Sequence, residues 1–173
     1  MKEKQLVHTE VVRSGERFPL VIVCEDMLDP LNVGSVFRLA DAMGVAKIYL
    51  TGMSVAPPHR KITKTARSTE KVVPYVKVED KALVISELKA KSYALIGLEI
   101  TSDSQSIFDF NFGAFDKIAL WMGSENTGIS ESVLAELTHC VHIPMQGTNS
   151  SMNVVQALGM GVFEVVRQEV GKS

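Results

Sequence analysis

Residues 20–50, "LVIVCEDMLDPLNVGSVFRLADAMGVAKIYL", contain two short apolar runs separated by one helical pattern. The runs "LVIVCE" (20–25) and "KIYL" (47–50) have the length and apolar character of buried strands. Residues 31–43 have apolar positions at helical spacing, and Gly44 follows them as a helix-ending residue. A strand, a helix and a second strand in this order predict a parallel strand pair with a crossover helix, which places the chain in the α/β class.

The same alternation continues to the end of the chain. Further strands are predicted at 72–78, 93–100, 117–123 and 140–145, and further helices at 59–68, 80–91, 130–137 and 151–168. Continuously apolar strands are typical of a parallel sheet that is covered on both faces. The sequence therefore predicts a three-layer α/β/α fold with a mainly parallel sheet. Residues 1–18 are interpreted as a short polar lead-in, and 19–173 as a single domain.

Composition narrows the functional classes. Twenty Asp and Glu oppose eighteen Lys and Arg, so the net charge of −2 gives no overall attraction to nucleic acid, and such a role would need a local patch. The N-terminus lacks the apolar core of a signal peptide, and no apolar run approaches the roughly 18 residues of a membrane span, so we expect a soluble cytoplasmic protein.

Cys24 and Cys140 are interpreted as reduced core thiols. The four histidines are scattered, so no metal site is expected, and phosphate-binding glycine motifs are absent.

Ligands of open parallel sheets bind beyond the carboxyl ends of the strands, so the loops there are the first candidates for a binding site. After the first strand, Asn32 and Gly34 are poor choices for the first turns of a helix. Arg38 is a cation on a largely apolar helix. One interpretation is an ion pair between Arg38 and Asp41, and the other is a contact with an anion or substrate.

Two later loops also carry unusual residues. In "MGSENTGIS" (122–130), Gly123 and Gly128 bracket a tight turn that would hold Glu125 near backbone amides. The turn precedes a helix that Ser130 can cap. By itself this pattern is common in ordinary turns.

The third loop is "IPMQGTNSSMN" (143–153). Ser150 or Ser151 can cap the last helix, which places Asn153 in its first turn. Free backbone amides there favour an electron-rich ligand group.

The last helix is apolar on nearly every side. Such a helix must be covered on more than one side. Gly159 and Gly161 each cost roughly 1 kcal/mol inside a helix, which close approach of another element would offset. The alternatives are a homodimer contact and a second helix layer from the same chain.

Cations are concentrated in "HRKITKTARSTEK" (59–71). They are expected to form one helical stripe, with Lys61 beside it, and only Glu70 opposes them; the stripe is Arg60, Lys64, Arg67 and Lys71. The alternatives are a solvated helix face and a patch that follows RNA phosphates.

Taken together, the three loops resemble the motifs of the SpoU (TrmH) family of SPOUT-superfamily RNA ribose 2′-O-methyltransferases. The resemblance covers residues 20–168, and its first motif is matched by Asn32, Gly34 and Arg38. "MGSENTGIS" resembles the second motif and "IPMQGTNSSMNV" the third. Val155 departs from the Ser that many members carry there, and Gln156 follows it.

The resemblance implies a fold, a cofactor and a site. It implies a deep C-terminal trefoil knot built by the loops 123–128 and 143–151, with S-adenosyl-L-methionine (AdoMet) bound in it. The implied cofactor residues are Leu98, Gly123, Ile143 and Met152, and the implied catalytic residues are Arg38, Asn32, Glu125, Ser151 and Asn153. It also implies a homodimer through the C-terminal helix and a tRNA or rRNA substrate.

Three other functions remain open on the sequence. One is a non-catalytic RNA-binding module on the same scaffold, and another is an AdoMet-dependent RNA base methyltransferase. A doubly wound nucleotide-binding enzyme is the third, but it would lack a phosphate loop.

Overall fold

The chain is built around one parallel sheet. The structure, a computed structural model, describes residues 4, 10, 15 and 17–171. Its seven strands lie in the order β3-β2-β1-β6-β4-β7-β5, and neighbouring strands run parallel. The strands are β1 (Phe18–Glu25), β2 (Val45–Thr51), β3 (Tyr75–Val78), β4 (Ala94–Leu98), β5 (Gln105–Ser106), β6 (Ile118–Met122) and β7 (His139–His142). The α-helices are α1 (Pro30–Ala42), α2 (Arg60–Ala66), α3 (Lys81–Ala90), α4 (Glu131–Leu134) and α5 (Val154–Val170).

The β1–α1–β2 unit forms as its sequence predicts. Residues Val21 to Glu25 pair in parallel with residues 47–51 of β2. The helix begins at Pro30, where Asp29 Oδ1 accepts a hydrogen bond from the Leu31 amide at 2.9 Å. It ends before Gly44, whose φ of 66° is costly for a residue with a Cβ.

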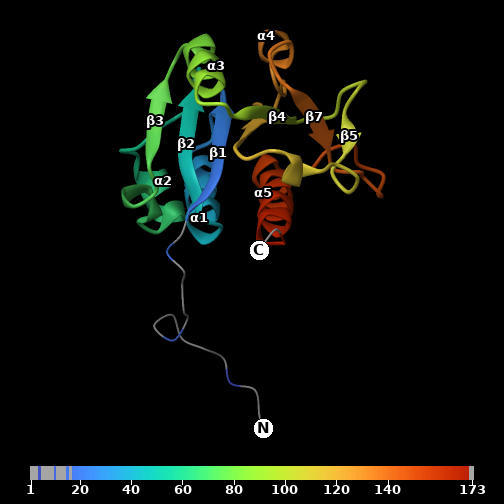
Figure 1. Ribbon diagram of the computed structural model, residues 1–173. Helices are drawn as coiled ribbons and strands as arrows, with labels where there is room; N and C mark the ends of the chain where they lie inside the picture. The colour runs from blue at the N-terminus through green and yellow to red at the C-terminus, as the bar shows by residue number, and fades with distance from the viewer. Residues whose placement is uncertain (1–3, 5–9, 11–14, 16, 172–173) are drawn as a thin grey trace.

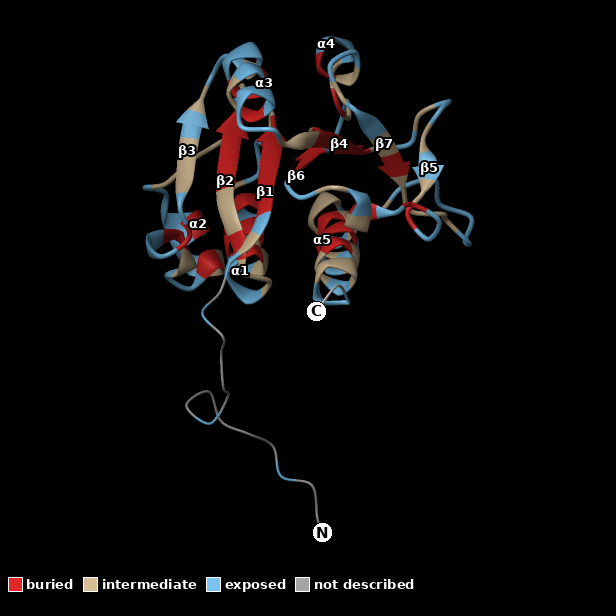
Figure 2. Cartoon of the chain, viewed as in Figure 1, coloured by how far each residue is buried: buried red, intermediate tan, exposed pale blue. Residues whose placement is uncertain are grey.

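Side chains of the central strands alternate between two hydrophobic cores. In β1, Leu20 and Ile22 belong to the core that α1, α2 and α5 cover, whereas Val21 and Val23 belong to the core that α3 and α4 cover. The buried strands therefore lie between two helix layers, as Figures 1 and 2 show. The predicted three-layer α/β/α arrangement with a parallel sheet is confirmed.

Two short elements escaped prediction, and several predicted boundaries were wrong. Strand β5 has two polar residues, too few to produce a periodic pattern. The 3₁₀ turns η2 (Thr69–Lys71) and η3 (Phe112–Ala114) were also missed. Phe18, placed in the lead-in, opens β1, and most of the rest of the lead-in lies outside the described residues.

The helix predicted at 59–68 ends earlier, at Ala66. Arg67 and Ser68 both have left-handed backbone angles, with φ of 52° and 71°, and Lys71 lies in η2. The predicted single helical stripe of cations is therefore wrong, because the last two cations of the stripe lie beyond the helix.

The cap of the last helix was also misplaced. Neither Ser150 nor Ser151 caps it; Asn153 does, because its Oδ1 accepts from the amides of Val155 and Gln156. The helix therefore starts at Val154, three residues later than predicted.

Membrane and metal features are absent from the part of the chain that the structure describes. None of the described helices is long and apolar enough to cross a membrane. Within the described residues, no group of three or more His, Cys, Asp or Glu side chains could hold a metal ion. Cys24 and Cys140 are free thiols; Cys24 is buried and Cys140 is half-buried.

Candidate functional site

A cavity of about 310 Å³ lies beyond the carboxyl ends of β4, β6 and β7 and against the first turn of α5. This is at the lower end of the volumes typical of small-molecule sites. All four residues predicted to bind the cofactor line it: Leu98, Gly123, Ile143 and Met152. Further lining residues are Glu99, Ile100, Met122, Ser124, Glu125, Gly128, His142, Met145, Ser150, Ser151, Asn153, Val154 and Ala157. One site therefore brings together the loop 122–130, the loop 143–153 and the chain after Leu98.

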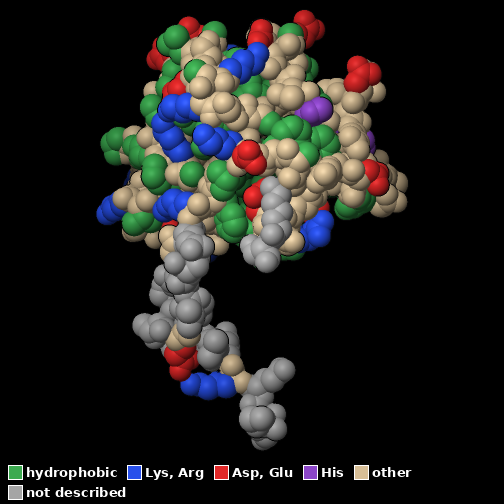
Figure 3. All heavy atoms as spheres, in the orientation of Figure 1, with side chains coloured by type: hydrophobic (Ala, Val, Ile, Leu, Met, Phe, Trp, Pro, Cys, Tyr) green, Lys and Arg blue, Asp and Glu red, His purple; other side chains and the backbone are tan. Residues whose placement is uncertain are grey.

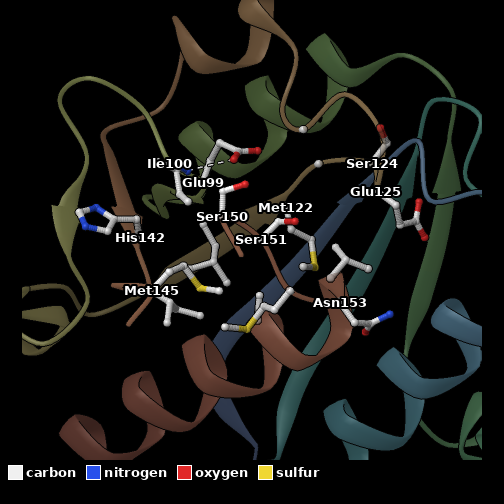
Figure 4. A pocket seen from close by; sticks show the side chains of 17 residues that line it. Glu99, Ile100, Met122, Ser124, Glu125, His142, Met145, Ser150, Ser151 and Asn153 are labelled. Atoms are coloured by element: carbon white, nitrogen blue, oxygen red, sulfur yellow. Dashed lines mark hydrogen bonds between the residues drawn. The ribbon is translucent and has the colours of Figure 1, made fainter. Parts of the chain in front are cut away.

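The walls of the cavity are mostly apolar, with polar groups at its edges. Methionine side chains project into the middle of the cavity, and Met122 and Met145 are labelled there in Figure 4. The side chains of Glu99 and Glu125 lie on opposite sides in the same view. An apolar interior with a few polar groups suits a flat heteroaromatic ring that carries polar substituents.

Three of the predicted catalytic residues form one hydrogen-bonded chain beside the cavity. Asn32 Nδ2 donates to Glu125 Oε1 at 2.7 Å, and Asn153 Nδ2 donates to Asn32 Oδ1 at 3.4 Å. Asn153 Oδ1 in turn accepts the first free amides of α5. This chain joins α1, the loop after β6 and the start of α5, so the structure brings together residues that are more than 90 positions apart.

The turn that carries Glu125 requires both of its glycines. Ser124 and Gly128 exchange backbone hydrogen bonds at 3.2 and 3.1 Å. Gly128 has a φ of 67°, and a Cβ at Gly123 would overlap the Gly128 backbone. Any side chain at either position would therefore force the turn open.

Two carboxylates that the sequence reasoning missed hold the end of this turn. Glu99 Oε2 accepts from the Ile129 amide at 3.1 Å, and Glu25 Oε1 accepts from the Ser130 amide at 3.3 Å. Glu25 and Glu99 therefore brace the end of the turn that carries Glu125. A charged residue at the end of an otherwise apolar strand was the available signal for both.

Glu25 is 1% exposed, and further partners satisfy it. It accepts from Trp121 Nε1 at 3.0 Å and from Lys81 Nζ at 2.6 Å. Lys81 also pairs with Asp26 at 3.3 Å. Such a paired, hydrogen-bonded environment allows a carboxylate to be buried.

Cys24, at the end of β1, is not a nucleophile here. Burial, followed by the charge of Glu125, raises the pKa of its thiol to about 12. The thiol therefore stays protonated at neutral pH and is unreactive.

Arg38 and Ser151 occupy different positions relative to the cavity. Ser151 lines it, whereas Arg38 lies on α1 and does not. Arg38 is exposed, and among the described residues it has neither an ion pair nor a hydrogen bond. The alternative pair with Asp41 is thus not formed, and the guanidinium is free to meet a ligand.

Comparison with known proteins identifies the family. The model described as "SpoU rRNA Methylase family" matches residues 19–163. The chain belongs to this family. The 23S rRNA (guanosine-2'-O-)-methyltransferase RlmB of Neisseria meningitidis is 33% identical to this SpoU chain, over 98% of the chain and 67% of that relative. The chain spans 58–67% of the length of the RlmB relatives that it matches.

A mammalian relative and a solved structure extend the comparison. The tRNA (guanosine(18)-2'-O)-methyltransferase TARBP1 of Mus musculus is 29% identical over 90% of this chain and 10% of its own length. The SpoU methyltransferase AviRb from Streptomyces viridochromogenes, in complex with AdoMet, superposes with a TM-score of 0.80 at 27% identity. That match covers 92% of this chain and 63% of AviRb. The suspected SpoU membership is therefore confirmed.

The predicted RNA-binding cations of this SpoU chain are all exposed. They are Arg60, Lys61, Lys64, Arg67 and Lys71, and within the described residues none of them forms an ion pair. Glu70, expected to oppose them, is buried and does not face solvent beside them. In Figure 3, Lys and Arg side chains gather over the half of the molecule that carries β2, β3, α2 and α3. These five cations are named the α2 patch below.

Proposed function

We propose that this chain is an AdoMet-dependent RNA methyltransferase that acts on a ribose 2′-hydroxyl. The observation that carries the proposal is the cavity beyond β4, β6 and β7, where the second and third motif loops meet and to which Asn32 of the first motif is joined through Glu125. Family membership supports it, and so does the structural match to AviRb, which was solved with AdoMet. The names of the RlmB and TARBP1 relatives give the ribose 2′-oxygen as their target.

The cavity residues fit this cofactor. Leu98, Ile143 and Met152 supply apolar surface for adenine, and their main-chain groups would bind its ring nitrogens. Gly123 borders the cavity with its backbone, and a Cβ there would overlap the Gly128 backbone and disturb the turn that forms this wall. We further propose that the loops 123–128 and 143–151 form the trefoil knot of the superfamily around this site.

AdoMet supplies a methyl group that is activated on a sulfonium sulfur. The chain must position the 2′-hydroxyl and stabilise the negative charge that develops on its oxygen. Asn32, fixed between Glu125 and Asn153, would orient the ribose or Arg38. Ser151, on the cavity wall, would complete the site.

Arg38 would act as an electrostatic clamp on the developing alkoxide or the adjacent phosphate. A guanidinium stays protonated at neutral pH and is therefore a poor general base, so base action by Arg38 is the less favoured alternative. The Arg38 side chain is exposed and has no partner among the described residues, so it is available to bind RNA.

The test is methyl transfer by Arg38→Ala. We expect at least a hundredfold loss of transfer to a cognate RNA, with AdoMet affinity unchanged, because Arg38 lies outside the cavity lining. Lys89→Ala, which removes an exposed cation from α3 that pairs with Glu136, is the matched control and should keep full activity. Retained transfer by Arg38→Ala would refute its assignment.

The substrate class is RNA, and rRNA and tRNA both remain candidates. RlmB relatives are named for 23S rRNA and TARBP1 for tRNA. Mapping 2′-O-methyl positions in total RNA from a deletion strain identifies the nucleotide. If the deletion strain loses a base modification and keeps every 2′-O-methyl group, the base methyltransferase is favoured. If the protein does not bind AdoMet, the non-catalytic RNA-binding module is favoured.

We also propose a cytoplasmic homodimer formed through α5. The outer face of α5 exposes apolar side chains, with Met160 at 49%, Phe163 at 58% and Val170 at 58%. Gly161 is explained within the chain, because a Cβ there would press on Leu98 and Leu120, but a Cβ at Gly159 would meet nothing within 4 Å. The open space at Gly159 supports close approach of a second copy.

A further inference from the structure

Glu99 lines the cavity but has no assigned role in binding. It follows Leu98 at the end of β4, and its side chain is half-buried. Its Oε1 accepts from the Ile100 amide at 2.9 Å and its Oε2 from the Ile129 amide at 3.1 Å. These bonds fix the carboxylate in place, and Gly128 leaves room for it because a Cβ there would overlap Oε2.

The two amides do not exhaust the carboxylate. Its two oxygens offer about four acceptor positions, so about two remain for a ligand. Glu99 and Glu125 are the carboxylates among the described cavity-lining residues, and Glu125 is already bonded to Asn32. Within the described residues, Glu99 has no side-chain partner, so it is the acceptor that a bound molecule would meet.

We infer that Glu99 binds the ribose of AdoMet by accepting hydrogen bonds from its hydroxyls, an inference that rests on the proposed function. Adenine is assigned to the apolar surface around Leu98, and Glu99 is the next residue along the chain. The sugar attached to adenine therefore comes beside this carboxylate. Paired hydroxyls are donors that one carboxylate can bind together, as acidic residues do for ribose in dinucleotide sites.

The position of Glu99 argues against an ion pair between its carboxylate and the sulfonium that carries the methyl group of AdoMet. The Asn32, Glu125 and Asn153 chain marks the end where RNA would meet the methyl group. Figure 4 places Glu99 on the other side of the cavity from Glu125 and Asn153. Glu99 therefore acts on the nucleoside part of the cofactor and favours ligands with an intact ribose.

The test compares wild type with Glu99→Gln by calorimetric titration with AdoMet, S-adenosylhomocysteine and methylthioadenosine. Gln keeps an oxygen for the Ile129 amide but removes the charge and one acceptor. We expect each ligand to bind about tenfold more weakly, because all three carry the same ribose. Glu136→Gln, an exposed change beyond the cavity, should leave all three affinities unchanged.

The pattern of losses across the three ligands identifies the part of the ligand that Glu99 contacts. A loss for AdoMet alone would assign Glu99 to the sulfonium, and a loss that spares methylthioadenosine would assign it to the amino-acid part; both overturn the inference. Equal affinities for wild type and Glu99→Gln also overturn it. If wild type binds none of the three ligands, the proposed function itself fails.

A second measurement needs no variant. The 3′-deoxy analogue of S-adenosylhomocysteine should bind wild type about tenfold more weakly than the parent compound. If Glu99→Gln folds, its affinities for the parent and the analogue should lie closer together than those of wild type. Equal affinities of wild type for the two ligands would refute the inference even if the variant does not fold.

Discussion

Asn153 shows how one side chain can serve both the fold and the site. Its Oδ1 caps α5 through the amides of Val155 and Gln156, and its Nδ2 reaches Asn32. Because the cap fixes the amide orientation, the donor is held toward α1. The asparagine thus accepts with one atom of its side-chain amide and donates with the other; an Asp cap has no donor, and a Ser cap has only one polar atom.

Substitution of Asn153 should separate these two roles. Asn153→Ala removes the cap and should lower the free energy of unfolding by about 1 kcal/mol. Asn153→Ser keeps a capping oxygen and should stay within a few tenths of a kcal/mol of wild type, yet lower methyl transfer because Asn32 Oδ1 loses its donor and Glu125 alone still bonds the Asn32 side chain. Urea unfolding followed by fluorescence of Trp121, the single and buried tryptophan, measures the stability.

Equal stability of Asn153→Ala and wild type would contradict the capping role. Full transfer by Asn153→Ser would contradict the role in holding Asn32.

The site residues predicted from sequence are those that a motif carries. Asn32 is a poor choice for the first turn of a helix, and Gly123 and Asn153 belong to the loops that resemble the second and third SpoU motifs. The contacts of Glu25 and Glu99 with the turn span 105 and 30 residues, so no local pattern reveals them. The signal of a charge ending an apolar strand gives a candidate but not its partner.

At the scale of elements, hydrophobic periodicity predicted the helices and the long strands because burial enforces it. Residues 20–25 and 117–123 each contain a strand whose side chains fill two cores alternately. Periodicity failed where backbone geometry decides the outcome. Helix α2 ends because Arg67 and Ser68 turn left-handed, which the regular spacing of the cations concealed.

Despite the shorter helix, the α2 patch should still bind RNA phosphates. Replacing Arg60 and Lys64, both on α2, with Gln should weaken RNA binding. The slope of log affinity against log salt should fall by about 0.7 for each lost contact with single-stranded RNA. Filter binding at several salt concentrations measures both.

The control for the α2 patch replaces two other exposed lysines. Lys89 and Lys91 pair with Glu136 and Glu87, so changing both to Gln removes charges that are already compensated. This variant should keep the wild-type slope. If the α2 variant keeps it too, the patch is a solvated surface and not an RNA contact.

At the scale of the whole molecule, α5 links the cavity to the outer surface. Its first turn borders the cavity, its inner face packs on β4 and β6, and its outer face stays apolar and exposed. α1 packs on one flank, but within the described chain no second helix layer covers Met160 and Phe163. Among the described residues, a second helix layer from the same chain, one of the two alternatives for burying α5, is therefore not found on its outer face.

Phe163→Glu should accordingly convert a dimer into a monomer. The side chain is 58% exposed in the single chain, so the charge costs the isolated fold little, but in a dimer it would be buried without a partner. Phe108→Glu, at 75% exposure beyond β5, makes the same chemical change away from α5 and should leave the mass unchanged.

Gly159→Ala should favour the helix by up to about 1 kcal/mol in the monomer yet weaken association, because its methyl group fills the space left for the second copy. Sedimentation equilibrium measures all three variants, and a wild-type mass of one chain at micromolar concentration would rule the dimer out.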